Sequence, residues 1–198
     1  MEIPEQYDIE ELKEGTQTPW LGLDAYNDFS QFSKLSYNCI SKLMKESELV
    51  WKILKYPEAD AWNKPNLRPD EKAALIYAGV GDSSKFNVFM DGKQPDVLVE
   101  QVSLLRIQPY YAVGINRTVG YIEVSMEVFS HYDINHLSNH TTRVDTIVEE
   151  LLRVFNGSNV GGLGLMAFSK MLDQSSRLFQ IGQIPFGGKQ LLFATYSA

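Results

Sequence analysis

The fold is decided by one stretch, residues 118–157, which reads TVGYIEVSMEVFSHYDINHLSNHTTRVDTIVEELLRVFNG. Its first part alternates between apolar and polar side chains. This two-residue period is typical of a strand with one solvent-exposed face. The apolar set is Ile122, Val124, Met126 and Val128, and the polar set is Glu123, Ser125 and Glu127. This part therefore predicts a strand that begins near Thr118.

The second part of the same stretch predicts a helix over residues 142–155. After a polar loop over 131–141, apolar side chains return at spacings of three and four residues, as on an amphipathic helix. That apolar stripe comprises Val144, Ile147, Val148, Leu151 and Phe155. Asn156-Gly157 should end the helix, because both residues tolerate the left-handed backbone that closes helices.

A longer helix is predicted before this stretch, over residues 33–56, with Glu46-Ser47 as a candidate break. Its apolar side includes Leu35, Cys39, Leu43, Val50 and Leu54. Pro57 should stop it, because the residue before a proline is pushed out of the helical region.

Residues 57–96 form an insertion rich in Pro, Asn, Asp and Gly. Connections longer than about 15 residues are uncommon unless they carry structure or function. Pro69-Asp70-Glu71 predicts a short helix over 69–78, since proline and acidic residues favour a first helical turn. Residues 85–89 predict a short extended piece.

The remaining strands are predicted by apolar runs bounded by turn residues. They cover 97–108, ended by Pro109, then 163–172, a short piece at 179–181, and 189–196 after a turn at Gly187-Gly188. The pattern predicts an α+β fold, a two-layer domain with an about four-stranded, mainly antiparallel sheet. Two main helices should cover one face. The other face, with Glu123, Ser125 and Glu127, should meet water or a polar partner.

An acidic arm is predicted at residues 1–32, ahead of a single domain at 33–198. Residues 1–30 contain eight acidic side chains against Lys13 alone, a net charge of −7 that equals that of the whole chain. The remainder is therefore neutral. An acidic segment on a neutral body is typical either of a solvated terminus or of an arm that contacts a neighbouring subunit.

No pattern in the sequence indicates catalysis, a cofactor or a metal. His131, His136 and His140 lie close together, but their spacings of five and four match no common zinc motif. Gly161 to Gly164 follows a helix and precedes a strand, which is the reverse of a phosphate-binding loop. Cys39 lies on an apolar helix side, where a thiol usually packs. We therefore expect no catalytic, cofactor-binding or metal-binding residues and a protein that is not an enzyme.

Direct recognition of nucleic acid or membrane is also not expected. The neutral body lacks the basic patch that phosphate binding needs, because its arginines are scattered along the chain. No apolar run approaches the roughly 20 residues that cross a bilayer.

The order of elements resembles the tail-terminator and head–tail connector proteins of tailed bacteriophages over residues 34–197. The resemblance rests on three short sequence segments. They are Leu54-Lys55-Tyr56 with 63–67 (NKPNL), Gly120-Tyr121-Ile122-Glu123-Val124 continuing to His131, and Arg143 to Asn156-Gly157. Residues 1–32 lie outside it, and the insertion 57–96 departs from the minimal terminator.

The resemblance implies a structural subunit of a phage neck ring between capsid portal and tail, acting by assembly. Six copies are implied first, and twelve are known for some adaptors. Portal or adaptor proteins would lie on one side and tail proteins on the other, with packaged DNA passing through the lumen without specific recognition. The location would be the virion neck or tail, assembled in the bacterial host cytoplasm. A portal-proximal adaptor or stopper ring is the alternative, and a stand-alone α+β ligand-binding domain or small enzyme is a further one.

Five aromatic residues in the arm, insertion and loops are candidates for the interface of such a ring. They are Trp20, Trp62, Phe86, Phe89 and Phe179. Aromatics in such places act either as local anchors or as interface hot spots.

Overall fold

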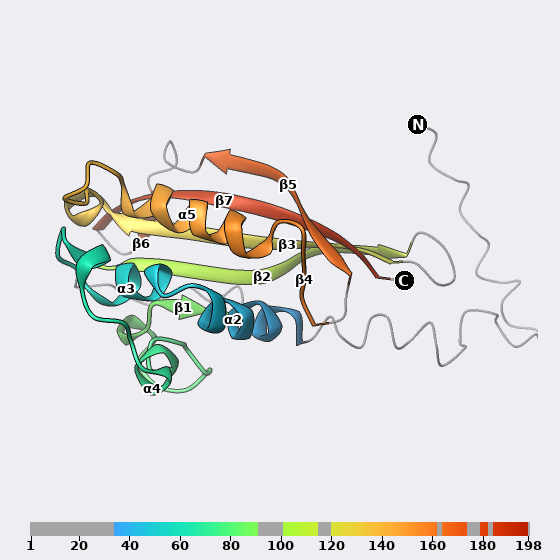
Figure 1. The fold of residues 1–198 in the computed structure, drawn as a ribbon, viewed down its shortest axis with the longest axis horizontal. Helices are drawn as coiled ribbons and strands as arrows, with labels where there is room; N and C mark the ends of the chain where they lie inside the picture. Colours follow the sequence, from blue (N-terminus) through green and yellow to red (C-terminus); the bar gives the residue numbers. More distant parts are fainter. Residues whose placement is uncertain are drawn as a thin grey trace, which may run out of the picture.

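The computed structural model describes residues 34–90, 101–114, 120–161, 164–173, 179–181 and 184–197. In Figure 1, the helices α2, α3 and α5 lie along a long twisted sheet. The mixed α+β class that the sequence predicts is confirmed.

The predicted first helix is two helices with a break where the sequence indicated one. They are α2 (Leu35–Glu46) and α3 (Leu49–Lys55). Ser47 stands between them in extended backbone, and its hydroxyl accepts a hydrogen bond from the amide of Val50 at 3.3 Å. A serine hydroxyl at this position starts the second helix by satisfying one of its free amides.

The described part of the insertion contains short elements. These are the 3-10 helices η4 (Ala61–Asn63) and η5 (Ser83–Lys85), the helix α4 (Pro69–Ala73) and the strand β1 (Val88–Phe89). α4 is shorter than predicted because the chain after it bonds to the start of β1. The amides of Asn87 and Tyr77 donate to the carbonyls of Leu75 and Val88 at 2.9 and 2.8 Å, which a longer helix would prevent.

The described residues form a sheet of seven strands, so the predicted four is too low. Besides β1, they are β2 (Ser103–Gly114), β3 (Gly120–His131), β4 (Ser158–Asn159), β5 (Leu165–Asp173), β6 (Phe179–Ile181) and β7 (Ile184–Ser197). The order is β1-β2-β3-β7-β5-β4, and β6 pairs with β7. β1 is parallel to β2, and every other pairing is antiparallel. The predicted extended piece at 179–181 is β6.

The decisive stretch forms β3, the 3-10 helix η6 (Tyr132–Ile134) and α5 (Arg143–Phe155). The Thr142 hydroxyl accepts a hydrogen bond from the amide of Asp145 at 3.0 Å and caps α5. Gly157 follows with a φ of 74°, the left-handed backbone predicted for the helix end. β3 pairs with β2 and β7, so this strand lies at the centre of the sheet.

Pro109 does not end β2, contrary to prediction. The strand continues to Gly114, and its register with β3 shifts between Pro109 and Tyr111. Proline has no amide hydrogen to donate, and a bulge is one of the few places in a sheet that tolerates this. The predicted strand start at Val97 lies outside the described residues.

Gly187-Gly188 is not a turn, which corrects a second prediction. Both glycines lie inside β7, opposite Ser130 and Phe129 of β3. A Cβ on Gly188 would lie 2.5 Å from the Phe129 ring and 2.6 Å from the Val128 carbonyl oxygen. Glycine is needed here for close packing.

One core fills the space between the helices and one face of the sheet. It includes the predicted apolar sides of α2, α3 and α5 together with the alternate apolar residues of β3. Trp51 and Phe193 are 0% exposed at its centre. A smaller cluster joins the insertion to the sheet, and its members are Tyr77, Phe89, Leu104 and Phe129.

At its centre, the opposite face of the sheet is more buried than predicted. Ser125 is 0% exposed, Glu127 is 7% exposed, and Gln190 of β7 is 8% exposed. Arg106 of β2 pairs with Glu127, and Gln190 Nε2 donates to Ser125 Oγ at 2.9 Å. These contacts satisfy much of the buried polar surface, as burial of polar groups requires, although Arg106 Nε has no hydrogen-bond partner among the described residues.

Candidate functional site

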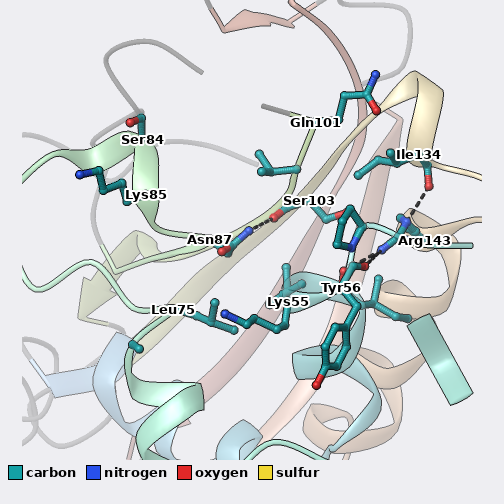
Figure 2. A pocket seen from close by; sticks show the side chains of 15 residues that line it. Lys55, Tyr56, Leu75, Ser84, Lys85, Asn87, Gln101, Ser103, Ile134 and Arg143 are labelled. Atoms are coloured by element: carbon teal, nitrogen blue, oxygen red, sulfur yellow. Dashed lines mark hydrogen bonds between the residues drawn. The ribbon is translucent and has the colours of Figure 1, made fainter. Parts of the chain in front are cut away.

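A cavity of about 270 Å³ opens where α3 ends, the insertion begins and β2 starts (Figure 2). Three cationic side chains line it, Lys55, Lys85 and Arg143, and none of the described residues in its lining carries a carboxylate. Its neutral polar lining comes from Tyr56, Ser84, Asn87, Gln101 and Ser103. A concave site with this lining favours an anionic group.

Arg143 is the deepest of the three cations and is 0% exposed. Its Nη1 donates to the carbonyls of Ile53 and Tyr56, both at 2.8 Å. Its Nε donates to the carbonyl of Ile134 at 2.6 Å, and its Nη2 donates to that of Glu58 at 2.5 Å. The guanidinium thus holds the end of α3, the start of the insertion and the loop before α5 together.

Burial lowers the pKa of Arg143, and the nearby charge of Glu58 opposes that shift. The side chain stays protonated at neutral pH, because arginine does so in proteins. Its charge faces the carbonyl oxygens at the C-terminal end of α3, where the helix dipole is negative. The carbonyls therefore compensate a cation that has no carboxylate at hydrogen-bond distance.

The two lysines are more exposed than Arg143 and lie nearer the mouth of the cavity. Among the described residues, neither a carboxylate within salt-bridge distance nor a hydrogen bond is found for Lys55 Nζ. Lys85 Nζ lies 4.0 Å from Asp82 Oδ2, at the limit of an ion pair. Both ammonium groups are therefore available to a ligand that enters the cavity.

Side-chain hydrogen bonds from Lys72 and Trp62 add to the contacts that fix the insertion to the rest of the domain. Lys72 of α4 is 4% exposed, and its ammonium donates to the carbonyl of Met44 at 2.9 Å and to Glu48 Oε1 at 2.6 Å. Trp62 Nε1 donates to Ser138 Oγ at 3.0 Å. The described insertion is thus attached to the α2–α3 break and to the loop before α5.

The outer edge of β5 is largely open. β5 pairs with β7 on one side, whereas on the other side β4 covers only Leu165 and Met166 in the described chain. Figure 1 shows β5 running past β4 at the border of the sheet. Exposed apolar side chains line this strand: Leu165 (66%), Phe168 (38%), Met171 (46%) and Leu172 (39%). Monomeric proteins usually protect such an edge with charges or a covering element.

In the described part of the chain, no strand pairs with the second half of β2 at the opposite border of the sheet. There, β1 pairs with β2 at Leu105 and Arg106 alone. Beyond them, Tyr110, Tyr111 and Val113 are 56%, 51% and 41% exposed. The sheet therefore presents two unlike open edges with apolar and aromatic side chains.

The structure describes the side chains of three of the five predicted interface aromatics, Trp62, Phe86 and Phe89. Trp20 lies outside the described residues, as does the side chain of Phe179 in β6. Trp62 is 41% exposed on the insertion. Phe89 is 2% exposed, and Phe86 packs beside it against Tyr77. Phe86 and Phe89 are thus local anchors, the alternative left open by the sequence.

The three histidines do not share one environment. His131 is 6% exposed, which corrects its placement in a solvated loop, and its Nδ1 accepts a hydrogen bond from the amide of Asp133 at 3.2 Å. His136 and His140 are exposed. Within the described ranges, no group of three or more potential metal ligands comes together. Burial raises the pKa of Cys39 to about 12, in keeping with a packed thiol.

Sequence reasoning missed the open edge of β5 and the role of Arg143. The sequence contained a signal for this edge. Apolar residues occur at both odd and even positions of the strand, whereas a strand with one buried face needs them at alternate positions only. Arg143 had a signal too, since a cation in the first turn of a helix is unfavourable unless a tertiary contact holds it.

A family model, YomW, matches residues 47–195. The chain belongs to the YomW family. This family comes from the SPbeta phage region of Bacillus. The match runs from the α2–α3 break to the end of β7 and includes the insertion, whereas the acidic arm lies outside it. A search of curated proteins found no match. In the described part of the chain, no helix is long and apolar enough to cross a bilayer.

Proposed function

We propose that the chain is a structural subunit of a phage neck ring, with tail terminator or head–tail joining as its role. It acts by oligomeric assembly and not by catalysis. The observation that carries the proposal is the open, apolar edge of β5. Membership in a family from a phage region supports the phage setting.

The chemistry of the two sheet borders supports the proposal of a ring. The β5 border offers Leu165, Met171 and Leu172, and the β2 border offers Tyr110 and Tyr111. Because the two borders differ, a contact between them is head-to-tail, and head-to-tail contacts close into rings when the rotation allows. Aromatic residues and methionine are also the types enriched in protein interfaces.

In this proposal six copies form the ring, with twelve as the adaptor-like alternative. Portal or adaptor proteins bind on one side and tail proteins on the other, in the virion neck. DNA passes through the lumen without sequence recognition. This agrees with the net charge of the residues outside the acidic arm, which is zero. A portal-proximal adaptor or stopper ring is the alternative role within the same architecture.

Native mass spectrometry of the full chain tests the proposal, together with averaged electron-microscope images of the particles and of virions. We expect closed rings of one copy number and density for the protein at the virion neck. A chain that stays monomeric at high concentration and is absent from virions would refute the proposal.

The cavity gives a specific reason to retain one different candidate, a ligand-binding domain. It adjoins the loop before α5, and Gln101 of its lining donates to Asp133 Oδ2 at 2.9 Å. Thermal-shift screening of the full chain against small organic anions distinguishes the two functions. Saturable stabilisation of a monomer by one such anion favours the binding domain.

A further inference from the structure

We propose that the cation-lined cavity is the docking site of the chain's own acidic arm, through carboxylates of residues 2–14. The inference goes beyond the ring function and does not depend on it, since the arm of the same copy or of an adjacent copy serves equally. The occupant is a named segment that lies outside the described residues.

Charge complementarity is the first argument. The arm contains Glu2, Glu5, Asp8, Glu10, Glu11 and Glu14 in its first half. Among the described residues, the cavity lining carries Lys55, Lys85 and Arg143 and no acid. The net charge of residues 31–198 is zero, so this grouping of three cations around one hollow differs from the average surface of the body. Complementary potentials of this kind direct docking and set its register.

Donors in the cavity are the second argument. Four N–H groups of Arg143 already donate to carbonyls, so its charge contributes to the field of the cavity without requiring a partner. Lys55 of α3 and Lys85 of the insertion both line the cavity, and their ammonium groups supply the mobile donors (Figure 2). A carboxylate between them would accept charge-assisted hydrogen bonds, which are stronger than neutral ones.

The reach of the arm is the third argument. The described chain begins at Lys34, next to the start of α2, and the cavity lies at the far end of α3. Twenty residues of helix separate these points by about 30 Å. Residues 15–33 span up to about 60 Å when extended. The acids of residues 2–14 therefore reach the cavity, whereas Asp28 is too close to the start of α2 to do so within one copy.

Disulfide trapping in the full chain locates the arm. Glu5→Cys, Glu10→Cys and Glu14→Cys are each combined with Gln101→Cys, an exposed lining residue whose replacement keeps both lysines, and then oxidised. Cys39 does not interfere because it is buried. The control partner is Lys45→Cys, which is exposed on α2 and nearer the root of the arm. A disulfide needs Cα atoms within about 7 Å. We expect trapping at Gln101→Cys to exceed trapping at Lys45→Cys, and equal or reversed yields would overturn the proposal.

Trypsin supplies an independent readout, because Lys13 is the one tryptic site within residues 1–30. We expect Lys55→Gln/Lys85→Gln to release the peptide 1–13 about fivefold faster than the unmodified chain, since each partly exposed ion pair contributes a few-fold. Raising the salt should accelerate release from the unmodified chain alone, because salt screens such pairs. Lys45→Gln/Lys52→Gln is the matched control and should leave the rate unchanged.

The outcomes separate this proposal from the ring. A disulfide within one chain of a protein that is monomeric supports docking and refutes the ring. Disulfides between neighbouring copies support both proposals. Intact rings with no trapping and an unchanged Lys13 cleavage rate overturn docking and leave the ring standing. Stabilisation of the chain by inorganic phosphate, with unchanged cleavage at Lys13 in the lysine variant, would make the cavity a free-anion site and overturn the proposal.

Discussion

Arg143 Nη1 donates a hydrogen bond of 2.8 Å to the carbonyl oxygen of Ile53, across 90 residues of sequence. The contact joins the first turn of α5 to the last turn of α3. Because the same guanidinium also bonds the carbonyls of Tyr56 and Glu58, it fixes the point where the insertion leaves the helical layer.

Replacing Arg143 with methionine should destabilise the fold by about 3 kcal/mol, since four carbonyl oxygens lose a charged partner in a buried place. Arg143→Lys should recover only part of this loss, because an ammonium lacks the planar fork that reaches several acceptors. Urea unfolding measures both effects. The control is Arg153→Met, whose side chain is 54% exposed, and its cost should stay below about 1 kcal/mol. Equal costs at the two positions would contradict the proposed role of Arg143.

The two glycines of β7 should respond differently to alanine. Gly188→Ala meets the Val128 carbonyl and the Phe129 ring, so we expect a loss of about 2 kcal/mol from overpacking. Gly187→Ala meets the ring of Tyr132 at 2.8 Å, and that side chain is exposed enough to move aside. Thermal unfolding of the two variants checks the order. A turn at these positions would instead tolerate both changes.

Charges placed on the β5 edge should prevent assembly without unfolding the subunit. Met171→Lys and Leu165→Lys add an ammonium to side chains that are 46% and 66% exposed in the single chain, so little packing is lost. Burying that charge in a contact would be costly. Light scattering and circular dichroism should show monomers with an intact fold. Val80→Lys, at 81% exposure on the insertion, is the control and should still form rings. Rings of unchanged size from Met171→Lys would show that β5 is not part of the contact.

Acid should weaken the joint between α5 and the α2–α3 break. Hydrogen bonds from Arg153 and then from Ser47 lower the pKa of Glu150 in the folded chain. A carboxyl with a lowered folded pKa adds stability above its unfolded pKa of about 4.3 and loses it as the pH falls through the folded value. Glu150→Gln should therefore be less stable at pH 7 and lose less stability between pH 5 and pH 3.

Urea midpoints measured across that pH range test this sign. Glu149→Gln is the matched control, because Glu149 is exposed and its neighbour Glu150 makes the contacts. Parallel pH profiles for the wild-type chain and Glu150→Gln would contradict the assignment.

Periodicity predicted the elements that have one buried face. The alternation around Val124 and the stripe around Ile147 correspond to β3 and α5, and the break at Ser47 separates α2 from α3. These patterns succeed because burial of one face selects the period directly.

The misplaced boundaries have local causes that composition does not reveal. Pro109 and Gly188 look like breakers, yet a bulge accommodates the first and close packing requires the second. The sequence predicts that Glu127 is exposed to solvent, yet Arg106 on the adjacent strand neutralises its charge. In each case the deciding partner comes from a different strand, so a single segment cannot show it.

The candidate sites were less predictable than the fold. Of the aromatic candidates, Phe86 and Phe89 belong to a local cluster, whereas most of the large exposed apolar side chains in the described chain lie on β5 and at the end of β2. The cavity depends on Lys55, Lys85 and Arg143, which are far apart in sequence. Only the packing of α3, the insertion and α5 brings their charges together.

β3 also sets a fixed length within the domain. Its 12 residues, paired along their whole length with β7, measure about 40 Å from end to end. Whatever binds at the hairpin end of the sheet is thus held at that distance from whatever binds at the end near His131. Shortening the span means deleting residues in pairs from neighbouring strands at once, because a single deletion turns every later side chain to the wrong face.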